Sequence, residues 1–389
     1  MSSHDLVNDL LRGRRSGYVP VEDLPWDDTV LAWTRQGYPM RAVYRDEGEN
    51  TWRPSDGRWV PAEKAGEHRE PVPPWEHFGW DMDLIWLSFD KMPYKGRSDL
   101  VEETEDWEVR RNGAGAALKY WKHRNGTPEH VDFRMTSREI WEREYRPLLE
   151  RFDPGRLDVL KTRRELEEGR ARGAWTFYGD LFVWELARAS LGDIGLYETL
   201  LLDPAWIHDF NRVYTDFYKL SFAWLFEHAG MPSGIWLYDD LGYRNGLFAR
   251  PEILAELYFP YYREIVEFFH GFGLPVVLHS CGSVPKALPM IVEAGFDGLN
   301  PMERKANGND PFRFAELYGD KLAFVGGLDA RVLETNDRDL VNKEITAYLE
   351  GMKERGARLV FGSDHSLSPL VRYDTYRYAL EVYRERRTY

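Results

Sequence analysis

Residues 275–282 read PVVLHSCG, a short apolar run that changes abruptly into small and polar residues. A run that is rich in β-branched residues and ends in reactive side chains is typical of a buried parallel strand near its carboxyl end. Five further runs have this texture: WTFYGD (175–180), GIWLYDD (234–240), FDGLNP (296–301), LAFVGGLD (322–329) and RLVFGSDHS (358–366). The repeated pattern predicts a parallel sheet whose strand ends carry the functional residues.

Amphipathic stretches fill the gaps between these runs. For example, Asn336 and Asp337 are suited to cap a helix whose apolar positions form one stripe before Gly356. Strands and helices in alternation, without a phosphate-binding fingerprint, favour an α/β protein with a (β/α)8 TIM barrel over an open sheet. We predict one domain over residues 1–389, with the main barrel body in residues 170–389.

Residues 1–150 differ from the rest of the chain in their composition and hydrophobic pattern. Ten of the fifteen tryptophans lie at or before Trp141, in a segment crowded with charge and proline. No hydrophobic period persists there for long. We therefore predict an irregular, aromatic-rich elaboration that precedes the barrel body.

The charge and the cysteine count exclude several classes of protein. Acidic residues number 65 and basic residues 51, which gives a formal net charge of −14 at pH 7. This balance argues against a broad nucleic-acid interface, and no stretch approaches the ~18 apolar residues of a membrane span. The single cysteine, Cys281, cannot form an intrachain disulfide. Because the amino-terminal text also lacks the continuous apolar core of a secretory signal, we predict a cytoplasmic protein.

His279 and Cys281 are the most informative pair of residues in the sequence. Side chains two positions apart on a strand share a face, so both can point into the mouth of a barrel. An imidazole and a thiolate together suit zinc. The alternative is a small core cysteine beside a hydrogen-bonded buried histidine.

Other strand ends offer the further ligands that zinc needs. Asp239 and Asp240 point to opposite faces of a regular strand, so one of them at most aims inward. His365 can approach the same mouth from the last run. Three protein ligands and one exchangeable position make a catalytic zinc site. The alternatives are a helix cap or a rim salt bridge for each carboxylate, and a metal-free bond to a substrate carboxylate for His365.

Three more strand-end residues are candidates for the pocket. Asn300 can orient a polar substrate atom, Asp329 follows two glycines that let backbone approach a ligand, and Tyr178 can line the mouth. Turn chemistry explains the first two equally well, and a packed tyrosine with a bonded hydroxyl is the commoner outcome for the third.

The text LPVVLHSCGSVPKALPMIVEAGFDGLNPMERKANGNDP, with YGDKLAFVGGLDARVL and LVFGSDHSLSP, resembles the uroporphyrinogen decarboxylase superfamily. It is most similar to the H-x-C branch, which includes zinc-dependent methyltransferases that serve corrinoid proteins. The likeness extends from about residue 230 to residue 389. The resemblance implies a (β/α)8 barrel that is often dimeric.

The resemblance also implies a function. It is a zinc-dependent methyltransferase or demethylase that moves a methyl group between a small methylated substrate or a thiol and a corrinoid carrier on a partner protein. His279 and Cys281 would be metal ligands, with Asp240 and His365 as further ligands or catalytic residues and Tyr178 as a third catalytic candidate. Substrate-binding residues would be Asn300, Asp329 and Asp239.

The sequence departs from both branches of that superfamily. The methyltransferases carry a second cysteine near the last strand, where this chain reads GSDHS. Any zinc here must therefore be completed by oxygen or nitrogen ligands. The text LRGRRSGYVP differs from the arginine-rich motif of the decarboxylases, which binds porphyrinogen carboxylates. The alternative functions are a metal-free decarboxylase or lyase that acts on a carboxylated substrate, and a non-catalytic binding protein.

Overall fold

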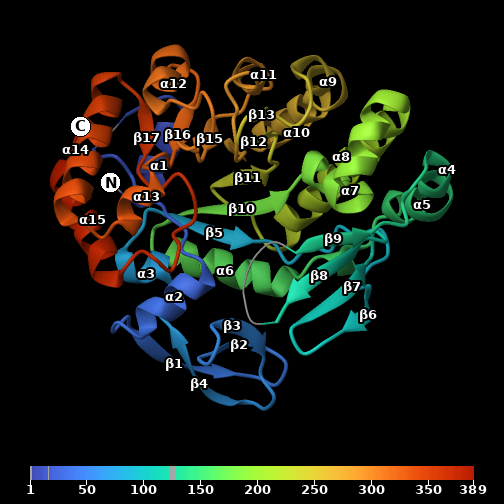
Figure 1. Cartoon of the computed structure of the whole chain (residues 1–389), viewed down its shortest axis with the longest axis horizontal. Coiled ribbons are helices and arrows are strands. Elements are labelled where there is room, and N and C mark those ends of the chain that lie inside the picture. Colours follow the sequence, from blue (N-terminus) through green and yellow to red (C-terminus); the bar gives the residue numbers. More distant parts are fainter. Residues whose placement is uncertain (1, 16, 123–127) are drawn as a thin grey trace. The chain divides into compact units, whose positions relative to one another are not determined.

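The computed structural model describes residues 2–15, 17–122 and 128–389. These residues form two compact units, which we treat separately. Figure 1 labels their helices and strands. The first unit comprises Met1–Asp83, Asn300–Lys305 and Asn309–Tyr389. The second unit comprises Leu84–Leu299 and Ala306–Gly308.

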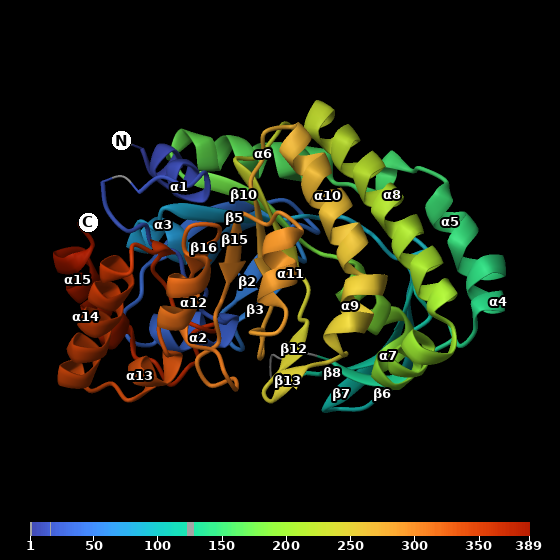
Figure 2. The ribbon, with the colours of Figure 1, turned by 90° about the horizontal axis from the view of Figure 1, so that it is seen from above.

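Three parallel strands form the centre of the second unit: β10 (Trp175–Leu181), β11 (Gly234–Tyr238) and β14 (Val276–His279). Almost every residue in them is buried, which suits their aromatic and β-branched composition. Helices α7 (Val183–Leu202) and α8 (Pro204–His228) connect β10 to β11, and α9 (Pro251–Leu257) and α10 (Phe259–Gly271) connect β11 to β14. Figure 2 shows α8 and α10 side by side. The predicted βα alternation is therefore present.

The period of two along these strands divides their side chains between two faces. On one face, aromatic rings form a continuous series: Phe177 stacks on Trp236 with ring centroids 4.8 Å apart, and Tyr238 lies 4.7 Å from the ring of His279. On the other face, Tyr178 packs against Phe226 of α8. Beyond the strand ends, the side chains that follow on this first face lie in the candidate site.

The rest of the second unit lies before β10 and after β11. An antiparallel sheet has the order β6-β7-β8-β9. Its strands are β6 (Ser98–Glu103), β7 (Trp107–Asn112), β8 (Ala117–Trp121) and β9 (Glu129–Asp132). The other elements are α4 (Arg138–Ile140), a π-helical turn at Trp141–Tyr145, α5 (Arg146–Glu150), a 3₁₀ turn at Pro154–Arg156, α6 (Val159–Ala171), β12 (Gly242–Tyr243), β13 (Gly246–Leu247) and α11 (Leu288–Glu293).

The first unit contains a second parallel pair, β16 (Ala323–Val325) and β17 (Arg358–Val360). An extended segment runs parallel to the continuation of β17 through bridges at Val21↔Phe361 and Pro25↔Leu367. Helix α14 (Arg338–Glu354) confirms the predicted cap, because the Asp337 carboxylate accepts the backbone N–H groups of Asp339 and Leu340.

Helices and hairpins complete the first unit. The helices are α1 (Ser3–Leu11), α2 (Asp27–Thr34), α3 (Pro74–Phe78), α12 (Pro311–Tyr318), α13 (Ala330–Glu334) and α15 (Tyr373–Arg386). β1 (Met40–Arg45) pairs with β4 (Gly66–Pro71), and β2 (Asn50–Arg53) pairs with β3 (Arg58–Pro61), both antiparallel. Two further strands, β5 (Met82–Trp86) and β15 (Gly298–Asn300), lie at the boundaries of the units.

The α/β class and the parallel strands are confirmed, whereas two finer predictions need correction. Among the described residues, neither unit by itself contains a closed ring of eight strands. The expectation that residues 1–150 are irregular is wrong, because their described residues form two antiparallel strand pairs and a four-stranded antiparallel sheet. Their strands are short and often exposed on both faces, as in β6, so they lack the alternation that reveals a strand. The single-domain organisation stays a prediction.

A search of the described residues finds no helix that is both long enough and apolar enough to cross a bilayer.

Candidate metal centre

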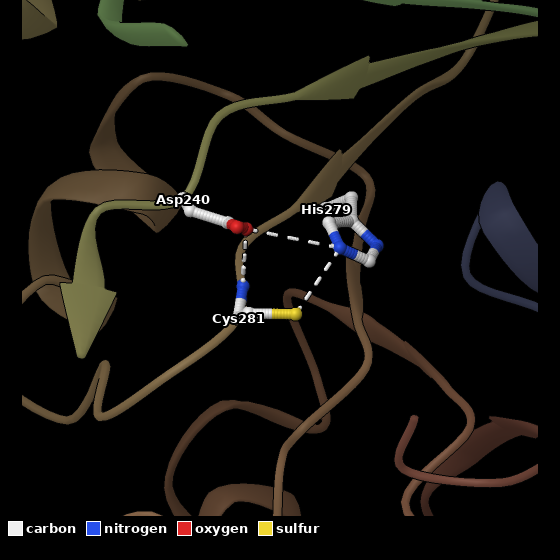
Figure 3. Close-up of side chains that lie close together, drawn as sticks. All are labelled: Asp240, His279 and Cys281. Atoms are coloured by element: carbon white, nitrogen blue, oxygen red, sulfur yellow. Dashed lines mark hydrogen bonds and ion pairs between the residues drawn. The ribbon is translucent and has the colours of Figure 1, made fainter. Parts of the chain in front are cut away.

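Asp240, His279 and Cys281 converge at the carboxyl ends of β11 and β14 (Figure 3). One ligand atom from each lies within 4.8 Å of the others. Asp240 lies two residues beyond β11, His279 ends β14, and Cys281 lies two residues beyond it in the following loop. The predicted H-x-C pair therefore shares a face, and of the two adjacent aspartates it is Asp240 that turns toward this pair.

The contacts within this group join all three residues. Cys281 Sγ lies 3.3 Å from His279 Nε2, and that nitrogen lies 3.8 Å from Asp240 Oδ1. The backbone N–H of Cys281 donates to Asp240 Oδ1 over 2.8 Å. A thiolate, an imidazole and a carboxylate are the three ligand types that zinc prefers, so the donor set fits zinc.

Backbone pairing holds the ligands at these positions. Tyr238 is the register partner of His279, and the next N–H, that of Asp239, donates to the carbonyl of His279 over 3.0 Å. The loops beyond the strands are packed closely. Gly282 has a φ of +77°, and a Cβ there would come within 2.3 Å of the Gly242 backbone. Only glycine tolerates both conditions, so this residue lets the Cys281 loop lie against the Asp240 loop.

A pocket of about 750 Å³ opens beside Asp240 and His279. Its walls include Glu185 and Arg188 from α7, with Tyr238 and Phe248. Arg188 donates to Glu185 over 2.8 Å and to Asp193 over 2.9 Å. Burial raises the pKa of Glu185, a shift that the Arg188 guanidinium opposes and the Asp240 carboxylate reinforces. A cation placed near Asp240 would relieve this repulsion.

Asp239 serves a structural purpose on the opposite face. Its carboxylate is fully buried and accepts the backbone N–H groups of Trp184 (3.1 Å) and Glu185 (2.8 Å) and the hydroxyl of Tyr262 (2.8 Å). Burial raises the pKa of Asp239 to about 8, although these three donors oppose the shift. Helix α7 has no capping side chain next to it in sequence, so Asp239 caps it from β11. The prediction that Asp239 binds substrate is wrong.

Tyr178 also lies on the face that packs against helices. Its ring is fully buried and its hydroxyl donates to the carbonyl of Gly230 over 2.7 Å. Burial raises the pKa of this hydroxyl well above its usual value. The catalytic role predicted for Tyr178 is therefore wrong, because strand alternation turns the side chain away from the pocket.

Replacing Tyr178 with phenylalanine should lower the free energy of unfolding by about 1 kcal/mol, the usual contribution of one buried hydrogen bond. Bound metal and turnover should not change. Urea denaturation monitored by circular dichroism checks the first expectation, and a metal assay with steady-state kinetics checks the second. A tenfold loss of turnover without loss of stability would restore the catalytic assignment.

The other predicted residues belong to the first unit. His365 lies near Trp26, with ring centroids 6.4 Å apart. The Asn300 amide donates to the carbonyl of Val325 over 3.1 Å. Asp329 caps α13 and pairs with Arg331 at 2.6 Å, as turn chemistry predicts. Their roles at the metal group stay predictions.

The sequence analysis missed Glu185 and Arg188. A usable signal was present, since both lie in the first turns of the helix that follows the WTFYGD run. In a βα unit these turns lie at the carboxyl end of the strand, where ligands bind.

Comparison with known proteins supports the superfamily. Residues 233–386 match the family model of uroporphyrinogen decarboxylase (URO-D), and this range includes all three residues of the metal group. The predicted resemblance to the uroporphyrinogen decarboxylase superfamily is therefore confirmed over these residues. No curated protein matches the chain significantly.

Solved structures extend the comparison to the fold of the whole chain. A methyltransferase from Methanosarcina mazei has a similar fold, with a TM-score of 0.66 and 13% sequence identity over 99% of each chain. An uncharacterised protein matches 43% of each chain at 15% identity with a TM-score of 0.28. At these identities the first match shows the fold alone, and the second carries no argument.

Proposed function

We propose that the protein is a zinc-dependent methyltransferase or demethylase, which moves a methyl group between a small methylated substrate or a thiol and a corrinoid carrier. The observation that carries the proposal is the group of Asp240, His279 and Cys281 at the ends of two parallel strands. The URO-D family match and the fold shared with a methyltransferase support it.

Asp240, His279 and Cys281 would hold the metal. When bound, zinc would act as a Lewis acid that lowers the pKa of a coordinated thiol or polarises the heteroatom of a methyl donor. With three protein ligands, one coordination position is left for the substrate, as in other catalytic zinc sites. His365 is proposed as a ligand in place of one of these three, or as an orienting residue.

The chain's own contacts prepare these ligands. Asp240 accepts the N–H of Cys281, so the carboxylate and the cysteine loop are held together before metal binds. The ring of Tyr238 packs on that of His279 and restricts its rotation. The Asp239 carboxylate attaches the first turn of α7, which carries Glu185, to the end of β11. Such supporting contacts commonly contribute 10- to 100-fold to metal affinity.

The proposal extends to partners and location. The methyl carrier would be a corrinoid held by a separate protein, the enzyme would be a homodimer, and it would act in the cytoplasm. Gel filtration with light scattering tests the dimer.

Metal analysis with a methyl-transfer assay tests the function. We expect about one zinc per chain in protein purified without chelator, as for other catalytic sites. We also expect methylation of a reduced corrinoid that depends on that zinc. Chelation should abolish turnover and zinc should restore it. Protein without zinc that cannot be loaded with it would contradict the proposal.

A metal-free decarboxylase is the second candidate, because the family model that matches residues 233–386 is that of a decarboxylase. It predicts release of carbon dioxide from a carboxylated substrate, with turnover that survives replacement of Cys281. The same preparations distinguish the two reactions.

A further inference from the structure

Ser280 lies between the two members of the H-x-C pair, yet its side chain belongs to the opposite face. Alternation along the extended chain turns it away from His279 and Cys281, and only 1% of it is exposed. Its hydroxyl accepts the backbone N–H of Leu241 over 2.9 Å. Leu241 follows Asp240 in the sequence. A side chain inside the H-x-C segment therefore holds the residue next to the third member of the metal group.

Two hydrogen bonds restrict the backbone on either side of Asp240. Before it, the N–H of Asp239 donates to the carbonyl of His279 over 3.0 Å. After it, the N–H that Ser280 accepts belongs to the peptide that joins Asp240 to the next residue. Because a peptide is planar, a bond to its N–H restricts the dihedral angles on both sides of it. The Ser280 hydroxyl therefore restricts the ψ angle of Asp240.

The position of the Asp240 carboxylate depends on this backbone. Its Oδ1 atom accepts the N–H of Cys281 over 2.8 Å and lies 3.8 Å from Nε2 of His279 (Figure 3). Rotation of the peptide that follows Asp240 would shift its Cα and with it the carboxylate, so that both distances would change. The bond to Ser280 opposes this rotation.

We propose that Ser280 is a positioning residue of the metal group: by holding the peptide after Asp240, it directs the Asp240 carboxylate toward the H-x-C pair before a metal binds. The inference deepens the proposed function and rests on it for one point, that this group binds zinc. A ligand that already points at the site loses less conformational freedom on binding. Removal of the Ser280 hydroxyl should therefore weaken metal binding, although it removes no ligand.

Competition with a chromophoric chelator measures the expected loss of zinc affinity. Ser280→Ala should bind zinc about tenfold more weakly than the unmodified protein, as for other contacts that support metal ligands. Ser283→Ala is the matched control, because it removes a buried hydroxyl from the same loop that donates instead to the carbonyl of Asn307 over 2.6 Å. The control should keep the zinc affinity of the unmodified protein. Equal losses in both variants would indicate general loosening of the loop and would overturn the proposal.

A double variant shows whether Ser280 acts through Asp240. In an Asp240→Ala background, the addition of Ser280→Ala should leave zinc affinity nearly unchanged, because no carboxylate is left to position. A further loss of about tenfold in that background would mean that Ser280 supports the H-x-C pair directly. That result would contradict the proposed role. Circular dichroism of each variant should match that of the unmodified protein.

A measurement without metal separates this inference from the proposed function. Cys281 is the only cysteine of the chain, so labelling with [¹⁵N]cysteine gives a single amide signal. In chelated protein, hydrogen exchange at this amide depends on its bond to the Asp240 carboxylate. Exchange should be about tenfold faster in Ser280→Ala and unchanged in Ser283→Ala. Asp240→Ala, which lacks the acceptor, gives the rate for complete loss of the bond.

The two proposals can fail separately. Exchange at the Cys281 amide that is as slow in Ser280→Ala as in the unmodified protein overturns the positioning role, whether or not the protein binds zinc. Faster exchange in Ser280→Ala, in a protein that cannot be loaded with zinc, supports the positioning of Asp240 and contradicts only the metal-dependent function.

Discussion

Replacing Cys281 with alanine is expected to lower zinc affinity by 10²- to 10³-fold and to abolish methyl transfer. Zinc sites bind with about 10 to 16 kcal/mol in total, so one ligand of four accounts for roughly 2.5 to 4 kcal/mol. Competition with a chromophoric chelator gives the affinity. The thiol is partly exposed, so its removal leaves little cavity and should not unfold the protein.

Variants of the other two ligands complete this test. His279→Ala should reduce zinc affinity as much as Cys281→Ala, and Asp240→Asn should reduce it less, because an amide oxygen remains. Matched controls are available in the same pocket, since His130 and Asp193 line it without belonging to the metal group. His130→Ala and Asp193→Asn should retain zinc. Full zinc retention in Cys281→Ala would contradict the assignment of this residue as a ligand.

Cobalt substitution gives a spectroscopic check that a structural role cannot imitate. Co²⁺ bound through a thiolate shows sulfur-to-metal charge-transfer absorption, which should be present in the unmodified protein and absent in Cys281→Ala. Circular dichroism of both proteins should coincide, which separates loss of a ligand from loss of fold.

The candidate site could be predicted as far as alternation within one strand allows. His279 and Cys281 are two residues apart, so their shared face follows from the sequence alone. The same rule shows that Asp239 and Asp240 point in opposite directions but does not show which of them points inward. That depends on the register of Tyr238 with His279, a pairing between segments about forty residues apart in the chain.

Tyr178 illustrates the same limit. It precedes a strand end, as site residues do, yet its hydroxyl is bonded to the turn before β11. The register of β10 with β11 pairs Tyr178 with Ile235, and both side chains face the helices. Long-range pairing, which no local pattern encodes, therefore decided which strand-end residues reach the pocket.

The antiparallel strands within residues 1–150 could not be predicted from the sequence, for another reason. Strand β6 is exposed at every position, and β9 likewise, so hydrophobic burial leaves no period in their sequences. The Lys122–Glu103 ion pair links the end of β8 with β6, which lies on the other side of β7, and both side chains are partly exposed. The sequence of such a charged segment predicts irregular structure, although the segment forms a sheet.

Replacing Lys91 with methionine is expected to lower the free energy of unfolding by about 3 to 5 kcal/mol. Lys91 forms an ion pair with Asp180, and both residues are buried. Asp180 Oδ1 accepts a further bond from the N–H of Leu181 at 2.8 Å, whereas no partner is found for Oδ2 among the described residues. Without the ammonium group, the carboxylate would be an uncompensated charge in the interior.

A double variant separates the charge from the packing. Lys91→Met with Asp180→Leu replaces the pair with apolar side chains, and its stability should exceed that of Lys91→Met alone. The matched control is Lys95→Met, because Lys95 pairs with Asp153 at 2.9 Å where both side chains are more than 40% exposed. Lys95→Met should lower the free energy of unfolding by less than about 1 kcal/mol. Urea denaturation of the unmodified protein, Lys91→Met, Asp180→Leu and the double variant gives the coupling energy.

The loss of free energy of unfolding in Lys91→Met should also depend on pH, and it should grow as pH rises. Burial raises the pKa of Asp180 in the folded protein, and the Lys91 ammonium opposes this shift. Without Lys91 the folded pKa rises further above its unfolded value, so the folded state binds more protons over the interval between them. The free energy of unfolding of the variant therefore falls as pH rises through that interval. Its deficit relative to the unmodified protein is larger at pH 8 than at pH 5. A deficit that stays constant from pH 5 to 8 would mean that folding of the variant takes up no proton in this range, so the Asp180 carboxylate would be ionised in the folded variant and the expected rise of its pKa would be contradicted.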